Sequence, residues 1–392
     1  MLLLLFVQGA ALLILLIRLS SAPRRIPPIA PKIDATLASV SVVIPTLNER
    51  SRLPTCLEAL RSEPVAEVLV VDSRSQDGTP EYVLEVQMEF PSPLHLVTDD
   101  PLPPGWVGRP WALHNGFLRS HPHSEWILGL DADTVPQPGL VHGAIQTAEA
   151  EGFDLVTLSP RFILKTAGEQ WLQPALLVTL IYRFGATGDR QQFTPERVLA
   201  NGQCFLVRRS VLEQLGGYEL ARSSFCDDVT LVRAAAQRGY RVGFLDGCQV
   251  IRVRMYTSLM ETWQEWGRSL DLKDASTLGQ TLGDCLFLTA VQGLPLPLVL
   301  LLPFLPAKGQ IVQIVLGLNV FLVVIRWLLV VGIRNSYTEV GAWFWLSPTA
   351  DPLAVMRIWL SALSRPKQWR GRTYGAITTP SVVATAPDLE RQ

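Results

Sequence analysis

Apolar segments near both ends of the chain constrain its fold most, because a segment embedded in lipid must satisfy its own backbone hydrogen bonds and is therefore helical. An almost wholly aliphatic run, with Gln8 as its only polar interruption, extends from Met1 to Ile17 and is followed by basic residues from Arg18 onward. A secretory signal would carry its positive charge before the apolar run and a small-residue cleavage site after it. We therefore predict an uncleaved transmembrane anchor at 1–19 with the following domain in the cytoplasm, and a removed signal peptide is the alternative.

Two further apolar runs lie near the other end, at 285–306 and 311–333, and each is long enough to span a bilayer. They predict two transmembrane helices within 282–333. Four prolines interrupt the first run, so a re-entrant hairpin is the alternative. Arg326 lies well inside the second run, where a charge is costly, and we expect it to snorkel to the lipid headgroups rather than face protein.

The segment 343–363 is also apolar but is broken by prolines and charges and carries three tryptophans. Tryptophan favours the membrane interface, so we predict an interfacial amphipathic segment at 334–377 rather than a fourth crossing. Three crossings also leave the basic tail on the cytoplasmic side. We further predict an interfacial helix at 259–281 and a flexible tail at 378–392. The predicted location is a cell membrane with several crossings, or a thylakoid or other internal membrane.

Composition excludes several classes of protein. The chain of 392 residues is 48% hydrophobic and only 18% charged, with a formal net charge of −1. It has no global positive field, so nucleic acid is not an expected partner. Its cysteines are scattered without the spacing of a zinc site, which favours a reduced compartment without disulfides. They are Cys56, Cys204, Cys226, Cys248 and Cys285.

A linker at 20–38 leads to a domain at 39–258 in which strand and helix signals alternate. Runs of β-branched and aliphatic residues predict strands at 40–44, 68–71, 94–97 and 126–130, with helical spacing between them. Strands that are apolar on both faces and separated by helices indicate an α/β fold with a doubly wound, mainly parallel sheet. In such sheets ligands bind at the carboxyl ends of the strands.

Polar residues follow three of these strands. The first ends in the segment 45–49, the second in Asp72 and a turn-rich stretch, and the fourth in Asp131-Ala132-Asp133. Singly, an aspartate after a strand is most often a helix N-cap. In an extended segment, however, Asp131 and Asp133 would point the same way and could share a hard divalent cation with phosphate oxygens.

The segments 44–49, 71–79, 131–133 and 226–228, in this order, resemble family 2 glycosyltransferases, which have the GT-A fold of nucleotide-diphospho-sugar transferases. The resemblance runs from about residue 39 to residue 256 and implies an inverting transfer from a nucleotide-sugar donor. By that similarity Asp131 would face the ribose, and Asp133 would hold the metal, Mg²⁺ or Mn²⁺, with Ala132 between them at the donor site. The implied nucleoside-binding residues are Pro45, Asn48, Glu49 and Asp72.

The acidic pair Asp227-Asp228 carries the predicted catalytic chemistry. Inversion requires a base to deprotonate the acceptor hydroxyl, and the resemblance implies Asp228 for this role. Like-charge repulsion from Asp227 would raise its proton affinity. Asp227 stands where the family carries Glu, so either carboxylate is a candidate. A pair that only stabilises the start of the helix running to Gln237 is the alternative.

Two arginines are further candidates on the donor side. The segment 104–112 could place Arg109 near a phosphate, with Trp106 or Trp111 beside the donor, or could be a rigid loop with its tryptophans in the core. Its Gly-Trp-x-Gly-Arg-x-Trp-Ala pattern resembles the subgroup that glucosylates carotenoids and related lipids. Arg254 is a candidate for the diphosphate or the acceptor site, and a surface-loop arginine is the alternative.

The acceptor side is predicted from two segments. Gly202 and Gln203 lie in a stretch that resembles the part of the family closing this side. Trp266 and Arg268 lie where processive members carry Gln-x-x-Arg-Trp, and the departure from that motif argues against a polymerising synthase. The sequence thus predicts transfer of one hexose, with UDP-glucose as the expected donor, to the hydroxyl of a carotenoid or other isoprenoid lipid. The alternatives are ceramide, diacylglycerol or polyprenyl phosphate as acceptor, and an inactive protein that keeps the fold as a scaffold.

Overall fold

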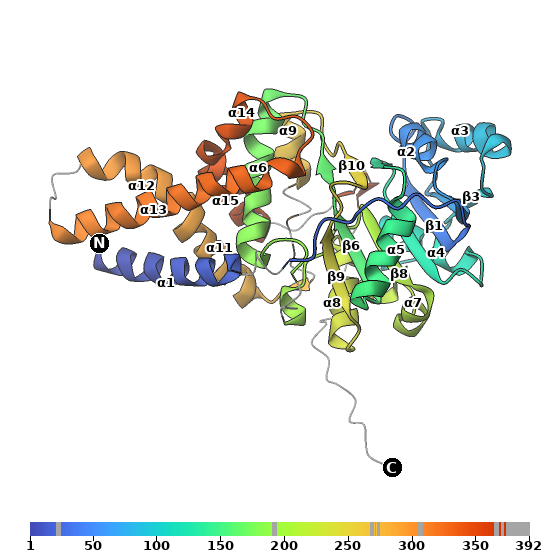
Figure 1. Cartoon of the computed structure of the whole chain (residues 1–392), viewed down its shortest axis with the longest axis horizontal. Coiled ribbons are helices and arrows are strands. Elements are labelled where there is room, and N and C mark those ends of the chain that lie inside the picture. Colours follow the sequence, from blue (N-terminus) through green and yellow to red (C-terminus); the bar gives the residue numbers. More distant parts are fainter. Residues whose placement is uncertain are drawn as a thin grey trace, which may run out of the picture.

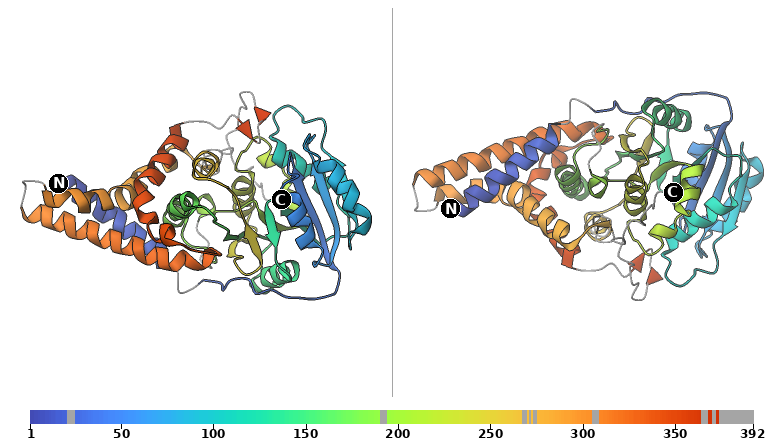
Figure 2. Two further views of the ribbon diagram at one scale, coloured as in Figure 1. Left: turned by 90° about the horizontal axis from the view of Figure 1, so that it is seen from above. Right: turned by 90° about the horizontal axis from the view of Figure 1, so that it is seen from below.

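The chain forms a sheet domain at one end and a group of long apolar helices at the other, as Figures 1 and 2 show. The first helix lies in the helical part, and the segment 25–37 runs from there along the sheet domain to the first strand. The structure is a computed structural model that describes residues 1–20, 25–189, 194–266, 270, 272, 275–304, 309–363, 368–369 and 372–373.

The sheet domain is built on a seven-stranded sheet in the order β3-β2-β1-β4-β8-β6-β9. β8 runs antiparallel to β4 and β6, whereas the other neighbours are parallel. The predicted mixed α/β fold with a mainly parallel sheet is confirmed, and the expected strands lie within β1 to β4. The strands are β1 (Ala38–Thr46), β2 (Val65–Asp72), β3 (Leu94–Thr98), β4 (Trp126–Leu130), β6 (Leu155–Ser159), β8 (Cys204–Arg208) and β9 (Val242–Asp246).

Each face of this sheet has its own hydrophobic core, because successive side chains of a strand point to opposite faces. Val42 and Ile44 of β1 pack on one face, and Val43 packs on the other with Phe205. The first face is covered by α2 (Leu53–Leu60), α3 (Thr79–Val86) and α5 (Leu140–Glu151). The second is covered by α4 (Gly108–Arg119), α7 (Arg209–Leu215) and α8 (Asp227–Gln237).

A small sheet and one long helix connect the domain to the helical part. The sheet has the order β5-β10-β7, with β5 (Thr134–Pro136), β7 (Arg161–Phe162) and β10 (Ile251–Val253). Helix α6 (Ala167–Phe184) follows β7 and begins at a capping box of Thr166 and Glu169. The sequence analysis did not predict α6, whose Leu172, Leu176 and Tyr182 lie in the core of the helical part.

Among the described residues, two helices are long and apolar enough to cross a membrane: α1 (Leu2–Leu19) and the segment Gln310–Ser336, which contains α13 (Gln310–Ile333). A third span is formed only if Leu278–Gly293 and Pro295–Phe304, bent by 42°, count as one. This bent pair comprises α11 (Leu278–Leu288), a π-helical turn and α12 (Pro295–Leu301). The bend falls at Pro295, which lacks an N–H for the helical hydrogen bond.

Arg326 of α13 does not snorkel, so that prediction is wrong. Its side chain is 4% exposed, and its Nε lies 2.8 Å from Oδ2 of Asp351, which is equally buried. Gln292 donates a further hydrogen bond of 3.1 Å to the same carboxylate. The charge of Arg326 is therefore balanced inside the protein by Asp351, the first residue of α15 (Asp351–Leu363).

A second buried polar contact joins α1 to α13. Gln8 and Asn319 are fully buried and donate to each other's side-chain oxygens at 2.9 Å in both directions. Gln8 also donates to the carbonyl of Ala290 at 3.0 Å. The one polar residue of the aliphatic run thus fixes α1 against its neighbours.

The predicted interfacial segments are only partly as expected. Within the described residues, 259–281 is not one helix: α9 (Leu259–Glu261) continues as a π-helix to Trp266, and α11 begins at Leu278. In α15, Ala354, Val355 and Ile358 are buried, while Leu353, Met356 and Leu360 are exposed, as an amphipathic helix requires. The tail at 378–392 lies outside the described residues. The remaining elements are α14 (Ala342–Trp345), β11 (Gln368–Trp369) and β12 (Arg372–Thr373).

Candidate active site

The polar ends of the central strands meet at one edge of the sheet. Thr46 of β1 is in register with Asp72 of β2, and β4, which leads into Asp131, lies on the other side of β1. The carboxyl ends of parallel strands share an edge, so these residues border one surface. The structure thus brings the predicted donor-side segments together.

The segments 46–50 and 72–79 form one hydrogen-bonded unit. Asp72 is buried and accepts hydrogen bonds from Thr46 Oγ1 at 3.1 Å and from Ser75 Oγ at 2.6 Å. Asn48 has a positive φ of 57°, and its Oδ1 accepts from the amide of Gln76 at 2.8 Å. Pro45, Asn48, Glu49 and Asp72 are therefore held in a fixed arrangement before any ligand binds.

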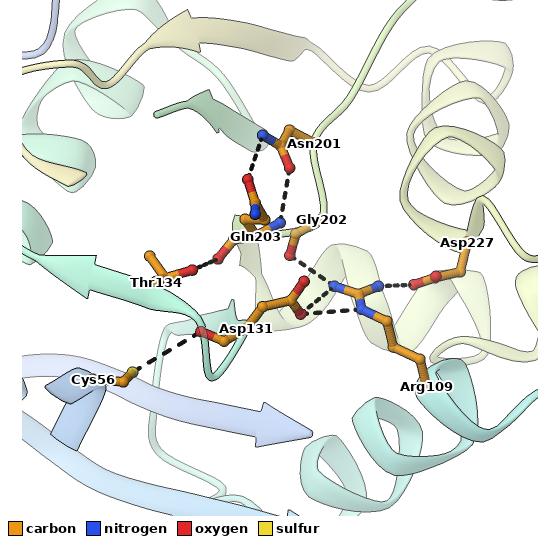
Figure 3. Close-up of polar contacts among 8 residues, drawn as sticks. All are labelled: Cys56, Arg109, Asp131, Thr134, Asn201, Gly202, Gln203 and Asp227. Atoms are coloured by element: carbon orange, nitrogen blue, oxygen red, sulfur yellow. Dashed lines mark hydrogen bonds and ion pairs between the residues drawn. The ribbon is translucent and has the colours of Figure 1, made fainter. Parts of the chain in front are cut away.

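Arg109 is the centre of a second cluster (Figure 3). Its Nε and Nη2 donate to Oδ1 of Asp131 at 3.1 and 2.9 Å, Nη2 also donates to the carbonyl of Gly202 at 2.7 Å, and Nη1 donates to Asp227. Arg109 lies at the start of α4, Asp131 after β4, and Asp227 at the start of α8. One guanidinium thus joins the donor-side strand end to the predicted catalytic pair.

The charges of this cluster shift one another. Burial raises the pKa of Asp227 to about 7, with Arg109 opposing and Asp228 and Asp131 adding to the rise. Burial likewise raises the pKa of Asp228, and again Arg109 opposes. Burial would lower the pKa of Arg109, but the surrounding carboxylates outweigh it and raise that pKa. The arginine stays charged while the acidic pair has an increased affinity for a proton.

The two aspartates differ in access. Asp227 is buried and paired to Arg109, whereas Asp228 is half-buried. In the part of the chain that the structure describes, Arg109 forms ion pairs with Asp131 and Asp227 but not with Asp228. The N-cap of α8 is Cys226, which makes no side-chain capping bond. Asp228 is therefore the better placed of the two to meet a ligand.

Gly202 and Gln203 hold the base of the cluster. The carbonyl of Gln203 accepts hydrogen bonds from the amide of Asp131 and from Thr134 Oγ1, both at 3.1 Å. Its side chain is tied to Asn201, as Figure 3 shows. A Cβ added at Gly202 would lie 2.6 Å from Nη2 of Arg109, so any larger residue would displace the guanidinium from its present position. These predicted acceptor-side residues are shown here in contact with the Arg109 cluster.

Asp131 and Asp133 do not lie on an extended segment, which corrects the geometric premise of the metal site. Residues 132 and 133 form a turn closed by the amide of Thr134 donating to the carbonyl of Asp131 at 3.0 Å, and Ala132 is buried in it. Among the described residues there is no group of three or more His, Cys, Asp or Glu that could hold a metal.

The donors present still fit a cation that a diphosphate helps to hold. Magnesium keeps several waters and uses one or two protein carboxylates together with phosphate oxygens. Both hydrogen bonds from Arg109 go to Oδ1 of Asp131, and this side chain is 28% exposed, which leaves Oδ2 for another ligand. Asp133 is half-buried and follows two residues later.

Three further predicted residues do not contact Arg109 within the described part of the chain, or are not described. The Arg254 guanidinium lies 3.8 Å from the buried carboxylate of Glu169, and the preceding residue, Val253, pairs with Thr134 of β5. Trp266 is 4% exposed and packs in the core of the helical part, near Phe162 and Tyr256. Arg268 lies outside the described residues.

Trp106 and Trp111 form an aromatic group with His114 rather than an open platform. The two indole centroids are 5.0 Å apart, and Trp111 lies over His114 at 5.9 Å. The indole N–H of Trp111 donates to the carbonyl of Asp99 at 2.5 Å. This rigid group supports the start of α4 and hence Arg109.

Comparison with known sequences agrees with this class of fold and site, that of a glycosyltransferase. The family model described as glycosyl transferase family 2 matches residues 41–216, which include Asp131, Arg109 and Gly202. Over these residues the chain is similar to this family.

Several relatives are similar to part of the chain. Glycosyltransferase AglE of Haloferax volcanii is 28% identical over 56% of this chain and 69% of its own length. The 4,4'-diaponeurosporenoate glycosyltransferase of Staphylococcus haemolyticus is 24% identical over 62% and 64%. The undecaprenyl-phosphate mannosyltransferase of Micrococcus luteus is 37% identical over 25% and 40%. The alignments thus cover between 40% and 69% of these relatives.

Sequence reasoning placed Arg109 near a phosphate and missed its contact with Asp227. The two residues are far apart in the chain, and no local pattern connects the start of α4 to the start of α8. The carbonyl of Gly202 was missed as a partner for the same reason, although the glycine itself signalled a close backbone approach.

Proposed function

We propose that this protein is an inverting, metal-dependent glycosyltransferase that moves one hexose, with UDP-glucose as the expected donor, to the hydroxyl of a membrane lipid. A carotenoid or another isoprenoid is the proposed acceptor. The observation that carries the proposal is the Arg109 bridge, which links the donor-side Asp131 to the acidic pair at 227–228. The proposed location is a membrane crossed more than once, with the sheet domain in the cytoplasm.

The donor would lie along the edge formed by Pro45, Asn48, Glu49, Asp72 and Asp131. This edge is already ordered by the hydrogen bonds within 46–50 and 72–79, so little conformational entropy is lost when a nucleotide binds. Asp133, with Oδ2 of Asp131, would hold Mg²⁺ or Mn²⁺ on the diphosphate. The bound metal would offset the charge that develops on the departing diphosphate.

Asp228 is the proposed base. It takes the proton of the acceptor hydroxyl while that oxygen bonds to the anomeric carbon, and the bond from this carbon to the UDP oxygen breaks with its electron pair leaving on UDP. The raised pKa of Asp228 strengthens it as a proton acceptor. Arg109, paired with Asp131 and buried Asp227, offsets part of the negative charge around Asp228.

The lipid acceptor is supported by the helical part and by the relatives. Exposed apolar side chains such as Leu353, Met356 and Leu360 on α15 suit the surface of a bilayer. One relative is named for 4,4'-diaponeurosporenoate and another for undecaprenyl phosphate. Polyprenyl phosphate is therefore the second candidate acceptor, with ceramide and diacylglycerol as further alternatives.

The test is transfer by the purified full chain in lipid nanodiscs. Radiolabelled UDP-glucose is supplied with Mg²⁺ or Mn²⁺ and with a panel of carotenoid, isoprenoid-alcohol, polyprenyl-phosphate, ceramide and diacylglycerol acceptors. Label in an extracted hydroxylated isoprenoid supports the proposal. Label only in a soluble sugar or peptide acceptor, with none in any lipid, contradicts it.

An Asp133→Ala variant separates the enzyme from an inactive scaffold. If the protein is an enzyme, we expect metal-dependent hydrolysis or transfer of the UDP-sugar that this variant loses. Calorimetry that shows no metal-assisted binding of UDP by the unaltered chain would favour the scaffold.

A further inference from the structure

Arginine side chains gather where the helical part meets the sheet domain, away from the Arg109 site. Arg18 lies in the last turn of α1, Arg183 in the last turn of α6 and Arg233 in α8, and Arg197 lies in the connection between α6 and β8. We call these four residues, with Asp284 of α11, the arginine cluster. Its members affect one another's charge, and the guanidinium groups of Arg183 and Arg233 both lie within 6 Å of the Phe184 ring centroid.

Positive charge in this cluster exceeds negative charge. Among its described side chains, Asp284 is the one carboxylate, and Arg197 holds it at 2.8 Å. Arg183 and Arg233 donate to backbone carbonyls: Arg183 Nε to Thr179 at 3.2 Å, and Arg233 Nε to Val198 at 3.0 Å. Neutral carbonyls satisfy hydrogen bonds but do not balance charge.

Two of these guanidinium groups are buried with unused donors. Arg183 and Arg233 are 5% and 4% exposed, and Nη2 of each is buried without a hydrogen-bond partner in the part of the chain that the structure describes. Burial, together with repulsion from neighbouring arginines, lowers the pKa of each to about 10. A buried charged donor without a partner is costly, so an anion bound next to either group would stabilise it.

A small cavity opens beside Arg183. It has a volume of about 20 Å³, and its polar lining comprises Arg183, Ser276, Thr281, Asp284 and Ser361. This space suits oxygens of a small anion and is too small for a sugar ring. Guanidinium groups with hydroxyl donors are a typical set for recognising phosphate.

The arginine cluster also lies at the ends of apolar segments. Arg18 is in the last turn of α1, a candidate span, and Asp284 is in α11, in the first half of the bent pair. Arginine at such an end lies at the depth of lipid headgroups. We infer that the arginine cluster is a binding site for a phosphate group, and that the headgroup of an anionic membrane lipid supplies it.

This inference does not depend on the proposed sugar transfer, because its readout is lipid binding. The full chain is purified in detergent, delipidated and titrated with dioleoyl phosphatidylglycerol, dioleoyl phosphatidylcholine or inorganic phosphate, and bound lipid is counted by native mass spectrometry. We expect one phosphatidylglycerol to bind at least about tenfold more tightly than phosphatidylcholine, because charge-assisted bonds to a net anionic group are the stronger.

Arg183→Gln and Arg233→Gln should each weaken that binding about tenfold. The matched control is Arg238→Gln, at the exposed end of the same helix as Arg233, which should leave it unchanged. Arg233→Lys keeps the charge and should retain most of the binding, which provides a variant if a glutamine variant fails to fold.

Binding of inorganic phosphate that is as tight as that of the lipid, and is lost in the same variants, would support the site and assign free phosphate as its source. Phosphatidylglycerol binding that neither variant weakens, or that Arg238→Gln weakens equally, would overturn the inference.

Discussion

Two buried arginine–aspartate pairs, Arg109–Asp227 and Arg326–Asp351, differ in what surrounds them. In the sheet domain, Arg109 and Asp227 are 13% and 5% exposed and adjoin Asp131, which is 28% exposed, and half-buried Asp228. In the helical part, Arg326 and Asp351 are each 4% exposed and adjoin Gln292. The first pair borders a surface that a ligand can reach, and the second is sealed.

This difference in surroundings indicates that the first pair takes part in the chemistry of the site and that the second stabilises the packing of the helices. A charge pair beside accessible carboxylates can respond to a substrate, since ligand binding changes its solvation and partners. A sealed pair can only fix the packing of the helices that carry it, because removal of one partner leaves an uncompensated charge. Substitutions in the first pair should therefore change activity, and substitutions in the second should change stability.

The largest expected effect is on activity. Asp228→Asn should lower kcat for sugar transfer about 10²- to 10⁴-fold, because the acceptor hydroxyl loses its base. Asp227→Asn, measured in parallel, should lower it less, since Asp227 is buried and acts through Asp228. A larger loss in Asp227→Asn would transfer the role of base to that residue.

The next effect is on stability in the helical part. Arg326→Met should lower the free energy of unfolding by about 3–5 kcal/mol, because Asp351 is left buried and charged. Chemical unfolding in detergent measures this loss, and Arg326→Met combined with Asp351→Leu should recover most of it. Reduced transfer per folded molecule in the single variant would show that this pair is not purely structural.

The third effect is a change in pH dependence. Arg109 opposes the raised pKa of Asp227 and Asp228, so Arg109→Gln should raise both pKa values further. A base must be deprotonated to act, and activity falls as pH decreases through its pKa. The acidic limb of kcat/KM should therefore move to higher pH by about one unit. An acidic limb at the same pH as in the unaltered protein, with activity retained, would show that Arg109 does not influence the pKa of the base.

A smaller effect is expected from Gly202→Ala. The new Cβ would lie 2.6 Å from Nη2 and 3.0 Å from Cζ of Arg109, so the guanidinium must move. We expect about a tenfold loss of kcat/KM from this displacement. Gly279→Ala, where nothing lies within 4 Å of the added Cβ, is the matched control. Equal losses in the two variants would contradict a positioning role for Gly202.

The smallest effect is expected at the amide pair of α1 and α13. Asn319→Leu removes the hydrogen bonds with Gln8 and should lower stability by about 0.6–2 kcal/mol, as for other polar contacts between apolar helices. Chemical unfolding in detergent measures the change. A loss of stability as large as that of Arg326→Met would contradict the expectation that the neutral Gln8–Asn319 pair contributes less than the charged Arg326–Asp351 pair.

Local patterns in the sequence were sufficient for the strands and for the polar strand ends. An uninterrupted run of mainly β-branched residues such as Val40–Ile44 is typical of a strand buried on both faces. Residues that follow such strands lie at the ligand-binding edge, because the carboxyl ends of parallel strands share one edge of the sheet. The apolar run at 2–19 could likewise be predicted as a candidate membrane span, because its length can be counted in the sequence.

Contacts between distant segments were not accessible in this way. The pairing of Arg326 with Asp351 depends on the packing of α13 against α15, and the bridge from Arg109 to Asp227 depends on how α4 and α8 meet. A charge in an apolar run has the same local sequence whether it snorkels or is paired. The turn after Asp131 was missed because the hydrogen bond of Thr134 and the carbonyl of Gln203 fix it, and Gln203 lies just before β8, much later in the chain.

The most direct test of sugar transfer to a lipid is a comparison of membrane lipids in source cells with and without this protein. We predict that mass spectrometry of the cells lacking it shows the loss of a hexosylated isoprenoid lipid, and that the unaltered chain restores this lipid whereas Asp228→Asn does not. Unchanged hexosylated lipids in cells without the protein, or restoration by Asp228→Asn, would contradict the proposed function.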